Sequence, residues 1–152
     1  MKSKTLQREQ LNRKMQVFRS AASVPVPPDG WIRAIRTSLG MSMQQLGNRL
    51  GVTRQNIHDV ERREQEGSIT IRNLREIGDA LDMKLIYAFV PNDGTLDALI
   101  ERKTRELAEK IVHRTDQNMR LESQENSAER LERAIRERAD ELRRETPRYL
   151  WD

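Results

Sequence analysis

Apolar residues recur at helical spacing through most of the chain, and one short segment departs from this pattern. The helical pattern predicts a helix over 4–20, a series of short helices over 29–82 and two long, charged helices over 95–146. Residues 83–91, MKLIYAFVP, are apolar on both faces and form the one strong strand candidate. The fold class predicted from this pattern is mainly all-α, with a single β-strand.

A proline-rich segment separates the first predicted helix from those that follow. The sequence VPVPPDG at 24–30 holds three prolines, which break helices and favour an extended tether. We therefore predict three parts: an N-terminal helix and tether over 1–28, a five-helix domain with a terminal strand over 29–91, and a charged helical extension over 92–152.

The two helices of the extension carry narrow apolar stripes between charged faces. Such stripes suit an antiparallel pair that packs on itself or on a second copy, so we expect the extension to serve dimerisation or partner binding. The apolar positions are Leu96, Leu99, Ile100, Leu107, Ile111, Val112, Ala128, Leu131, Ile135, Ala139 and Leu142.

The end of the chain, TPRYLWD, places three large apolar side chains after a helix-stopping proline. Tyr149, Leu150 and Trp151 would expose a large apolar area unless they dock. They either pack back on the protein or anchor a partner, since tyrosine and tryptophan are favoured interface anchors.

Residues 29–67 contain a sequence of helix start and stop signals. Asp29 can cap a first helix, and Gly40 can end it. Ser42 starts a second helix with Gln45 three residues on, which predicts a capping box. Gly51 closes that helix, and Thr53 caps a third that runs to about residue 64, with Gly67 beyond it.

The spacing within 42–62 predicts a helix-turn-helix. Two short helices that cross steeply need a residue of minimal size where they meet, and Gly47 stands there. The turn needs a residue that tolerates positive φ, which Gly51 supplies. The positions that should face the core are all apolar, namely Leu46, Leu50, Val52, Ile57 and Val60.

With these residues in place, 31–82 resembles the phage-repressor family of helix-turn-helix domains, the Cro and C1 type also called XRE. In that fold the third helix lies in the major groove of duplex DNA. The resemblance implies that Arg54 and Gln55 are the main base readers, with Asp59 as a third and His58 as a further base reader on the same exposed face. Arginine can bond guanine O6 and N7 together, and glutamine can bond adenine N6 and N7.

The resemblance also implies contacts to the DNA backbone and a scaffold ion pair. Arg36 and Glu61 occupy positions that pair in this family, and we interpret both as structural. Met43 stands where glutamine is frequent, so it can reach a phosphate only through its backbone N–H. For any one of the arginines expected to contact phosphate, a side chain that simply faces solvent is an equally good interpretation. The full set of expected phosphate contacts is Ser42, Met43, Thr53, Asn56, Arg62, Arg63 and Arg72.

The predicted strand carries an expectation about assembly. A lone strand leaves its backbone donors and acceptors unpaired, and no second segment of similar quality occurs in the chain. We expect the same strand of another copy to pair with it, giving a homodimer that reads a palindromic site. The alternative is a short edge paired with the proline-rich tether. The residues expected at the dimer contact are Leu85, Ile86, Tyr87, Ala88 and Phe89.

Composition narrows the classes of function. The net charge is only +4, so a nucleic-acid surface must come from local clustering. The chain has no cysteine, and its two histidines, His58 and His113, have no ligand cluster beside them. We expect no catalytic residue, no metal and no cofactor. The start of the chain lacks a signal peptide and no stretch is long and apolar enough to span a membrane, so we expect a cytoplasmic protein.

Over nearly its whole length the chain resembles the family named mobile mystery protein A. The order of parts carries this resemblance: a first helix, a proline tether, WIRAIRTSLGMS, LIYAFVP, charged helices and PRYLWD. It implies autoregulation in a toxin–antitoxin-like operon with a Fic-domain partner, an enzyme that transfers AMP to hydroxyls. Fic enzymes are commonly silenced by a helix with the pattern Ser/Thr-x-x-x-Glu-Gly/Asn. Thr5 and Glu9 match that pattern, whereas Gln10 departs from it.

Overall fold

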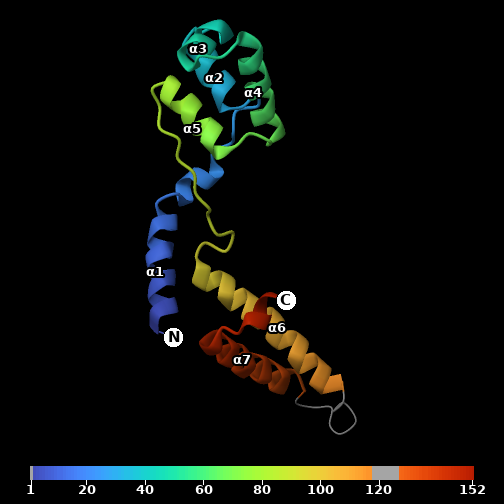
Figure 1. Ribbon diagram of the computed structural model, residues 1–152. Coiled ribbons are helices and arrows are strands. Elements are labelled where there is room, and N and C mark those ends of the chain that lie inside the picture. The colour runs from blue at the N-terminus through green and yellow to red at the C-terminus, as the bar shows by residue number, and fades with distance from the viewer. Residues whose placement is uncertain (1, 118–126) are drawn as a thin grey trace. The chain divides into compact units, whose positions relative to one another are not determined.

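The computed structural model describes residues 2–117 and 127–152 and divides into two compact units. One unit comprises residues 20–88, and the other combines 1–19 with 89–152. The described residues are mostly helical, as expected (Figure 1). None of their helices is both long and apolar enough to cross a membrane.

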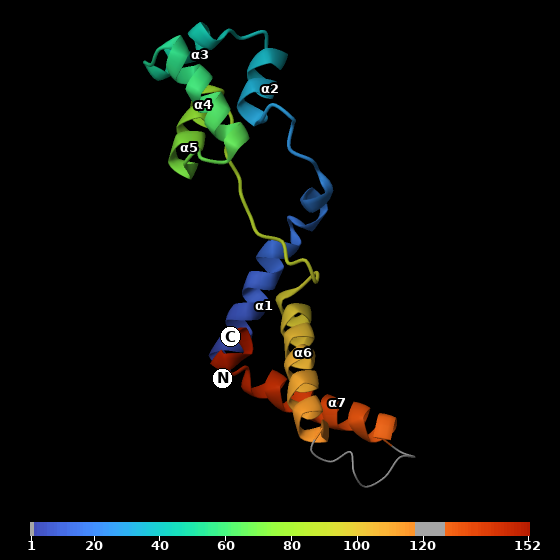
Figure 2. The same cartoon turned by 90° about the vertical axis from the view of Figure 1, so that its right-hand side faces the viewer.

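The unit over 20–88 contains four α-helices in close succession (Figure 2). They are α2 (Trp31–Ser38), α3 (Met43–Leu50), α4 (Arg54–Glu66) and α5 (Ile71–Ala80). These are all the helices within 29–91, so the predicted count of five in that range was wrong. The polypeptide leaves α5 at Asp82, which has a φ of 58°, and continues as extended backbone instead of a further helix.

A single apolar core holds these four helices together. Each helix contributes side chains at the predicted spacing, and the amphipathic pattern of each one faces this core. The buried members are Ile32, Leu46, Ile57, Val60, Ile77 and Leu81, surrounded by half-buried side chains that include Met43, Leu50, Val52 and Leu74.

The second unit is built on two long helices, α6 (Leu96–Gln117) and α7 (Ser127–Glu145). They pack through the predicted stripes, with Ala108, Ile135 and Leu142 buried between them, and Arg105 joins Glu132 across the pair at 3.1 Å. The predicted helix pair is therefore confirmed. The part of the predicted 95–146 helix pair at 118–126 lies outside the described residues.

The first helix, α1 (Lys2–Gln16), belongs to this same unit and docks at the start of α6. The Asp97 carboxylate accepts hydrogen bonds from Arg8 Nε at 2.6 Å and from Asn12 Nδ2 at 2.7 Å. The Asn12 side-chain oxygen Oδ1 accepts from the backbone N–H of Leu96 at 2.9 Å. Asn12 thus satisfies a free donor at the N-terminus of α6 from a distant part of the chain. The predicted helix over 4–20 ends earlier, and a 3₁₀ helix, η1 (Arg19–Ser23), follows.

Just before and within α6, Arg102 ties a loop carboxylate to the helix. Its guanidinium bonds Asp93 at 2.7 Å and Glu106 at 2.9 Å. These hydrogen bonds lower the pKa of the Asp93 carboxyl and of the Glu106 carboxyl, and they raise the pKa of Arg102. This cluster lies in solvent at the N-terminal part of α6, where it joins the preceding loop to the helix.

The last residues pack back on the protein. Leu150, in the 3₁₀ helix η2 (Arg148–Trp151), is buried, and η2 contacts α6. Tyr149 and Trp151 stay about half exposed. Of the two expectations for this segment, docking on the chain itself is confirmed for Leu150.

The predicted strand over 83–91 was wrong for the single chain. In the described residues, backbone groups of 84–90 form no hydrogen bond to another backbone group, and the proline-rich segment does not pair with them. A strand requires a partner that exchanges hydrogen bonds with it, and the described part of one copy supplies none. Leu85 is half-buried, whereas Ala88 is exposed and the large side chains Ile86, Tyr87 and Phe89 are 68%, 60% and 84% exposed.

Candidate nucleic-acid interface

The start and end of α3 and the start of α4 follow the predicted capping signals. Ser42 Oγ accepts from the Gln45 N–H at 3.1 Å, and Gln45 Oε1 accepts from the Ser42 N–H at 2.8 Å. Gly51 ends α3 in the left-handed conformation, with φ of 68°. Thr53 Oγ1 accepts from the Asn56 N–H at 3.1 Å and thereby caps α4. The capping box, the turn and the second cap are therefore confirmed.

Gly47 lies where α3 meets the backbone that leads into α4. A Cβ atom at this position would stand 2.7 Å from the Val52 carbonyl oxygen, which is closer than real side chains come. The Gly47 carbonyl also accepts from the Val52 N–H at 2.9 Å. The absence of a side chain thus lets the two helices approach closely, as the spacing predicted.

An ion pair in the interior connects α2 to α4. Arg36 Nε donates to Glu61 Oε1 at 2.6 Å, and a second guanidinium nitrogen donates to Glu61 Oε2 at 3.2 Å. Arg36 also donates to the Met41 carbonyl at 2.9 Å. The side chains are only 8% and 5% exposed, so the pair is a scaffold element and its members are not available to DNA.

The C-terminal part of α4 is fixed by a contact that the sequence analysis missed. The Glu64 carboxylate accepts from the backbone N–H of Trp31 at 2.8 Å and of Ile32 at 2.9 Å, and so caps the N-terminus of α2. The expected cap by Asp29 was wrong, because Gly30 is the residue before the helix and no side chain of that segment bonds to it. A Cβ on Gly30 would meet Glu64 Oε1 at 2.8 Å, so the glycine makes room for the distant carboxylate.

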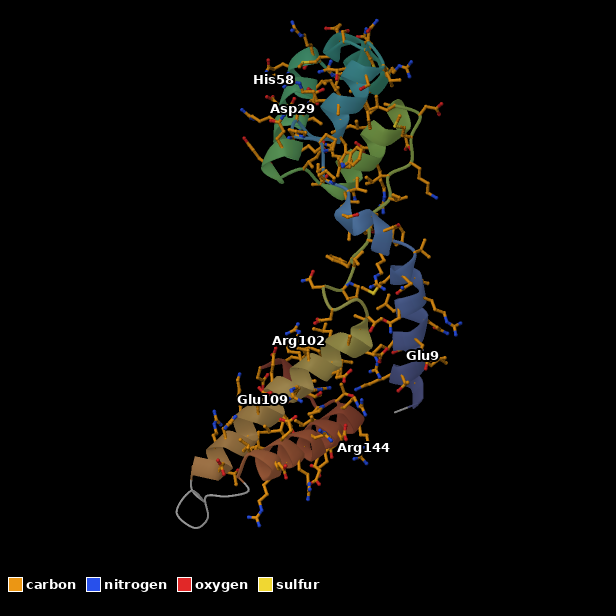
Figure 3. The ribbon with its side chains drawn as sticks, turned by 180° about the vertical axis from the view of Figure 1, so that it is seen from behind. Glu9, Asp29, His58, Arg102, Glu109 and Arg144 are labelled. Atoms are coloured by element: carbon orange, nitrogen blue, oxygen red, sulfur yellow. The ribbon has the colours of Figure 1, made fainter. Side chains whose placement is uncertain are left out.

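The expected base readers lie on the outer side of α4. Arg54 and Gln55 occupy its first turn and are exposed, and His58 is exposed one turn later (Figure 3). Asp59 is already engaged: its Oδ1 accepts from Gln55 Nε2 at 3.2 Å and lies 3.7 Å from His58 Nδ1. Arg62 approaches the same oxygen at 3.9 Å. The helix therefore gathers four polar side chains into one group on its outer side: Gln55, His58, Asp59 and Arg62.

The expected phosphate contacts divide by their surroundings. Ser42, Thr53, Asn56, Arg62 and Arg72 are exposed. The Met43 side chain packs against the apolar core, which leaves its backbone N–H at the start of α3 as the group that faces outward. Arg63 is half-buried, and its Nε is a buried donor without a hydrogen-bond partner among the described residues. Two helix N-termini, those of α3 and α4, also present unpaired backbone donors of the kind that binds phosphate.

These features are those of a helix-turn-helix, and the comparison with protein families agrees. The family model described as Helix-turn-helix matches residues 32–87. This stretch is a helix-turn-helix domain. Such a domain indicates a DNA-binding regulator of transcription. Searches of curated proteins and of solved structures gave no significant match.

Among the described residues, no cluster of three or more histidine, aspartate or glutamate side chains is placed to hold a metal ion.

Proposed function

We propose that the protein is a sequence-specific transcriptional regulator that reads duplex DNA with α4. The observation that carries this proposal is the exposure of Arg54 and Gln55 on the first turn of a helix whose two ends are both fixed. Gly47 and Thr53 hold the N-terminal end, and Glu64 ties the other end to α2. A rigid helix with free polar side chains at its N-terminal end suits the major groove.

The chemistry of these side chains suits base recognition. Arg54 can donate two hydrogen bonds to guanine O6 and N7. Gln55 gives one N–H to Asp59, which leaves a second N–H and the carbonyl oxygen for adenine N7 and N6. In this proposal Asp59 orients Gln55, and His58 lies beside the reading pair. Backbone contacts come from Ser42, Thr53, Asn56 and the exposed arginines Arg62 and Arg72.

The test is selection of bound duplexes from a random pool, followed by titration of the selected site. Replacing Arg54 and Gln55 with alanine together is expected to weaken binding to that site by about thirty-fold or more, because each two-bond contact discriminates by roughly 1–3 kcal/mol. Arg133→Ala, which removes an exposed arginine from α7, is the matched control and should leave site binding unchanged. Unchanged sequence preference in the double variant would reject the reader assignment.

We further propose that the protein acts as a homodimer on a palindromic operator. The support is the row of apolar side chains over 85–89, of which Leu85 is half-buried and the others exposed, and whose backbone is unpaired in the described chain. Pairing of this segment with its copy would bury those side chains and satisfy those backbone groups. Two copies related by a two-fold axis would read half-sites roughly 34 Å apart.

A charged substitution tests the dimer. Ile86→Lys places a charge in the proposed contact and should shift the protein from dimer to monomer in sedimentation experiments. Val24→Lys is the control, since Val24 is 58% exposed in the tether and Ile86 is 68% exposed. A wild-type protein that remains monomeric at micromolar concentration would refute the dimer, as would an Ile86→Lys variant that still dimerises.

The resemblance to mobile mystery protein A extends the proposal to the operon that encodes the protein. We propose a cytoplasmic, non-enzymatic repressor of its own operon, encoded beside a Fic-domain enzyme. The alternative is that the protein inhibits that enzyme directly and that DNA binding is secondary. The near-match to the inhibitory pattern is exposed on α1 at all three positions, Thr5, Glu9 and Gln10, which supports the alternative. Figure 3 labels Glu9 on this helix.

One assay distinguishes direct inhibition of the Fic enzyme from repression of the operon alone. If the Fic partner is inhibited through α1, its transfer of AMP should fall when this protein is added in excess, and Glu9→Gly should restore the transfer. Full AMP transfer in the presence of excess wild-type protein would reject direct inhibition and leave the repressor proposal intact.

A further inference from the structure

The positive charge of the chain is concentrated outside the helix-turn-helix domain. Residues 1–19 contain six basic residues and one acidic residue. Residues 20–88, the unit with the helix-turn-helix, contain nine basic and eight acidic residues. Residues 89–152 contain thirteen basic and fifteen acidic residues. The first nineteen residues therefore hold more than the whole excess of the protein, whose net charge is +4.

Most of this charge is free to act on a partner. Among the basic side chains of α1 that the structure describes, Arg8 is engaged by Asp97. Lys4, Arg13 and Lys14 are exposed and form no ion pair with any described residue. A helix that carries several cations and a single anion, here Glu9, raises its own electrostatic energy, and it gains the most from a polyanionic partner.

We propose that α1 is a second DNA-contacting surface, which binds phosphate groups of the duplex and does not read sequence. This inference rests on the proposed function, because it assumes that the helix-turn-helix brings the protein to DNA. A unit with nine basic and eight acidic residues neutralises few phosphates, and neutralising phosphates supplies most of the non-specific part of DNA affinity. The unpaired cations of α1 supply this non-specific part of the affinity for DNA.

The remaining exposed side chains of α1 favour a phosphate backbone over an acidic protein. Gln7, Gln10 and Gln16 are exposed amides, which are common donors to phosphate oxygens. The core of a protein–protein interface is depleted of charge and rich in aromatic side chains. α1 has no aromatic residue, and Leu6 and Leu11 are its exposed large apolar side chains.

The test is the salt dependence of DNA binding by the full-length protein. The variant Lys4→Gln/Arg13→Gln/Lys14→Gln removes three cations and keeps good helix formers. The slope of log Kobs against log salt is expected to become shallower by about 0.9 for each lost phosphate contact, and so by up to about 2.7. The selected sequence should stay the same. Arg8 is left in place because it holds α1 to α6.

The control has the same change of charge elsewhere. Arg130, Arg133 and Arg136 are exposed on α7, a helix with six basic and six acidic residues. Replacing these three with glutamine should leave the slope at the wild-type value. A wild-type slope in the α1 variant would overturn the proposal and point to an acidic protein surface as the partner of α1, and equal changes in both variants would overturn it too.

Failure of the proposed function would give a different result. If the wild-type protein showed no preference between the selected site and an unrelated duplex, sequence-specific regulation would be rejected. The contribution of α1 would still be measured on the unrelated duplex, where the α1 variant should again show the shallower slope. An equal slope on that duplex would overturn the proposal for α1 as well.

Discussion

The buried pair of Arg36 and Glu61 allows one prediction to be worked out from the structure. Arg36→Met removes the guanidinium while nearly keeping the apolar volume of the side chain. Glu61, 5% exposed at its side chain, then loses both of its hydrogen bonds from Arg36, and the Met41 carbonyl loses a third. Nothing else in the described chain bonds to that carboxylate, so a charge is left buried without a partner.

The expected cost follows from the desolvation of that charge. Breaking a buried ion pair by removing one partner lowers the free energy of unfolding by about 3–5 kcal/mol. Natural domains are stable by only about 5–15 kcal/mol, so the helix-turn-helix unit should be close to unfolding at room temperature. Replacing both partners, as Arg36→Met/Glu61→Leu, removes the unpaired charge and should recover most of the loss.

The measurement is urea unfolding followed by tryptophan fluorescence. Trp31 begins α2 and reports on the helix-turn-helix unit, whereas Trp151 lies in the other unit, so all variants carry Trp151→Phe. The single variant should show a lower midpoint with an unchanged slope against urea. A loss below about 1 kcal/mol would refute the buried-charge argument, given the magnitudes for such pairs. So would a double variant as unstable as the single one.

Three further predictions concern the helix-turn-helix unit. Gly47→Ala pushes a methyl group against the Val52 carbonyl and should lower the free energy of unfolding by about 1–3 kcal/mol, measured in the same urea titration; an unchanged midpoint would contradict the close approach. Glu64→Ala removes the cap of α2 and should cost about 0.5–2 kcal/mol, whereas Glu64→Gln should cost less, since its amide oxygen can still accept; equal losses would rule out the cap. Asp59→Ala should relax base preference only at the position that Gln55 reads, and it should have no effect once Gln55 is alanine; loss of preference at a separate base pair would make Asp59 a reader in its own right.

The local signals in the sequence predicted most of the helix-turn-helix domain. The capping and turn residues act on close neighbours in the sequence, so their spacing alone determines which backbone groups they satisfy. These residues are Ser42, Gln45, Gly51 and Thr53. The pairing of Arg36 with Glu61 spans 25 residues and came from family resemblance.

The contacts that escaped prediction join residues far apart in the sequence. Glu64 reaches Trp31 across 33 residues, and Asn12 reaches Leu96 across 84. Nothing in the local spacing marks these residues, because a glutamate on a charged helix and an asparagine on a basic one are usually solvated. The strand over 83–91 failed for a related reason. Its apolar pattern is present, but strand formation depends on a partner that a single chain does not contain.

The discontinuous make-up of the unit formed by 1–19 and 89–152 determines the order in which the protein can fold as it leaves the ribosome. The helix-turn-helix unit lies wholly between the two pieces, and the buried residues of its core, the last of which is Leu81, include none from α6. Arg8, by contrast, must wait for Asp97, 89 residues later, which at ordinary rates of synthesis is about 4–18 s. A helix as short as α1, with 15 residues, is marginal in water alone. A fragment that ends before residue 95 would therefore keep every buried residue of the helix-turn-helix core and carry an unfolded, positively charged N-terminal segment.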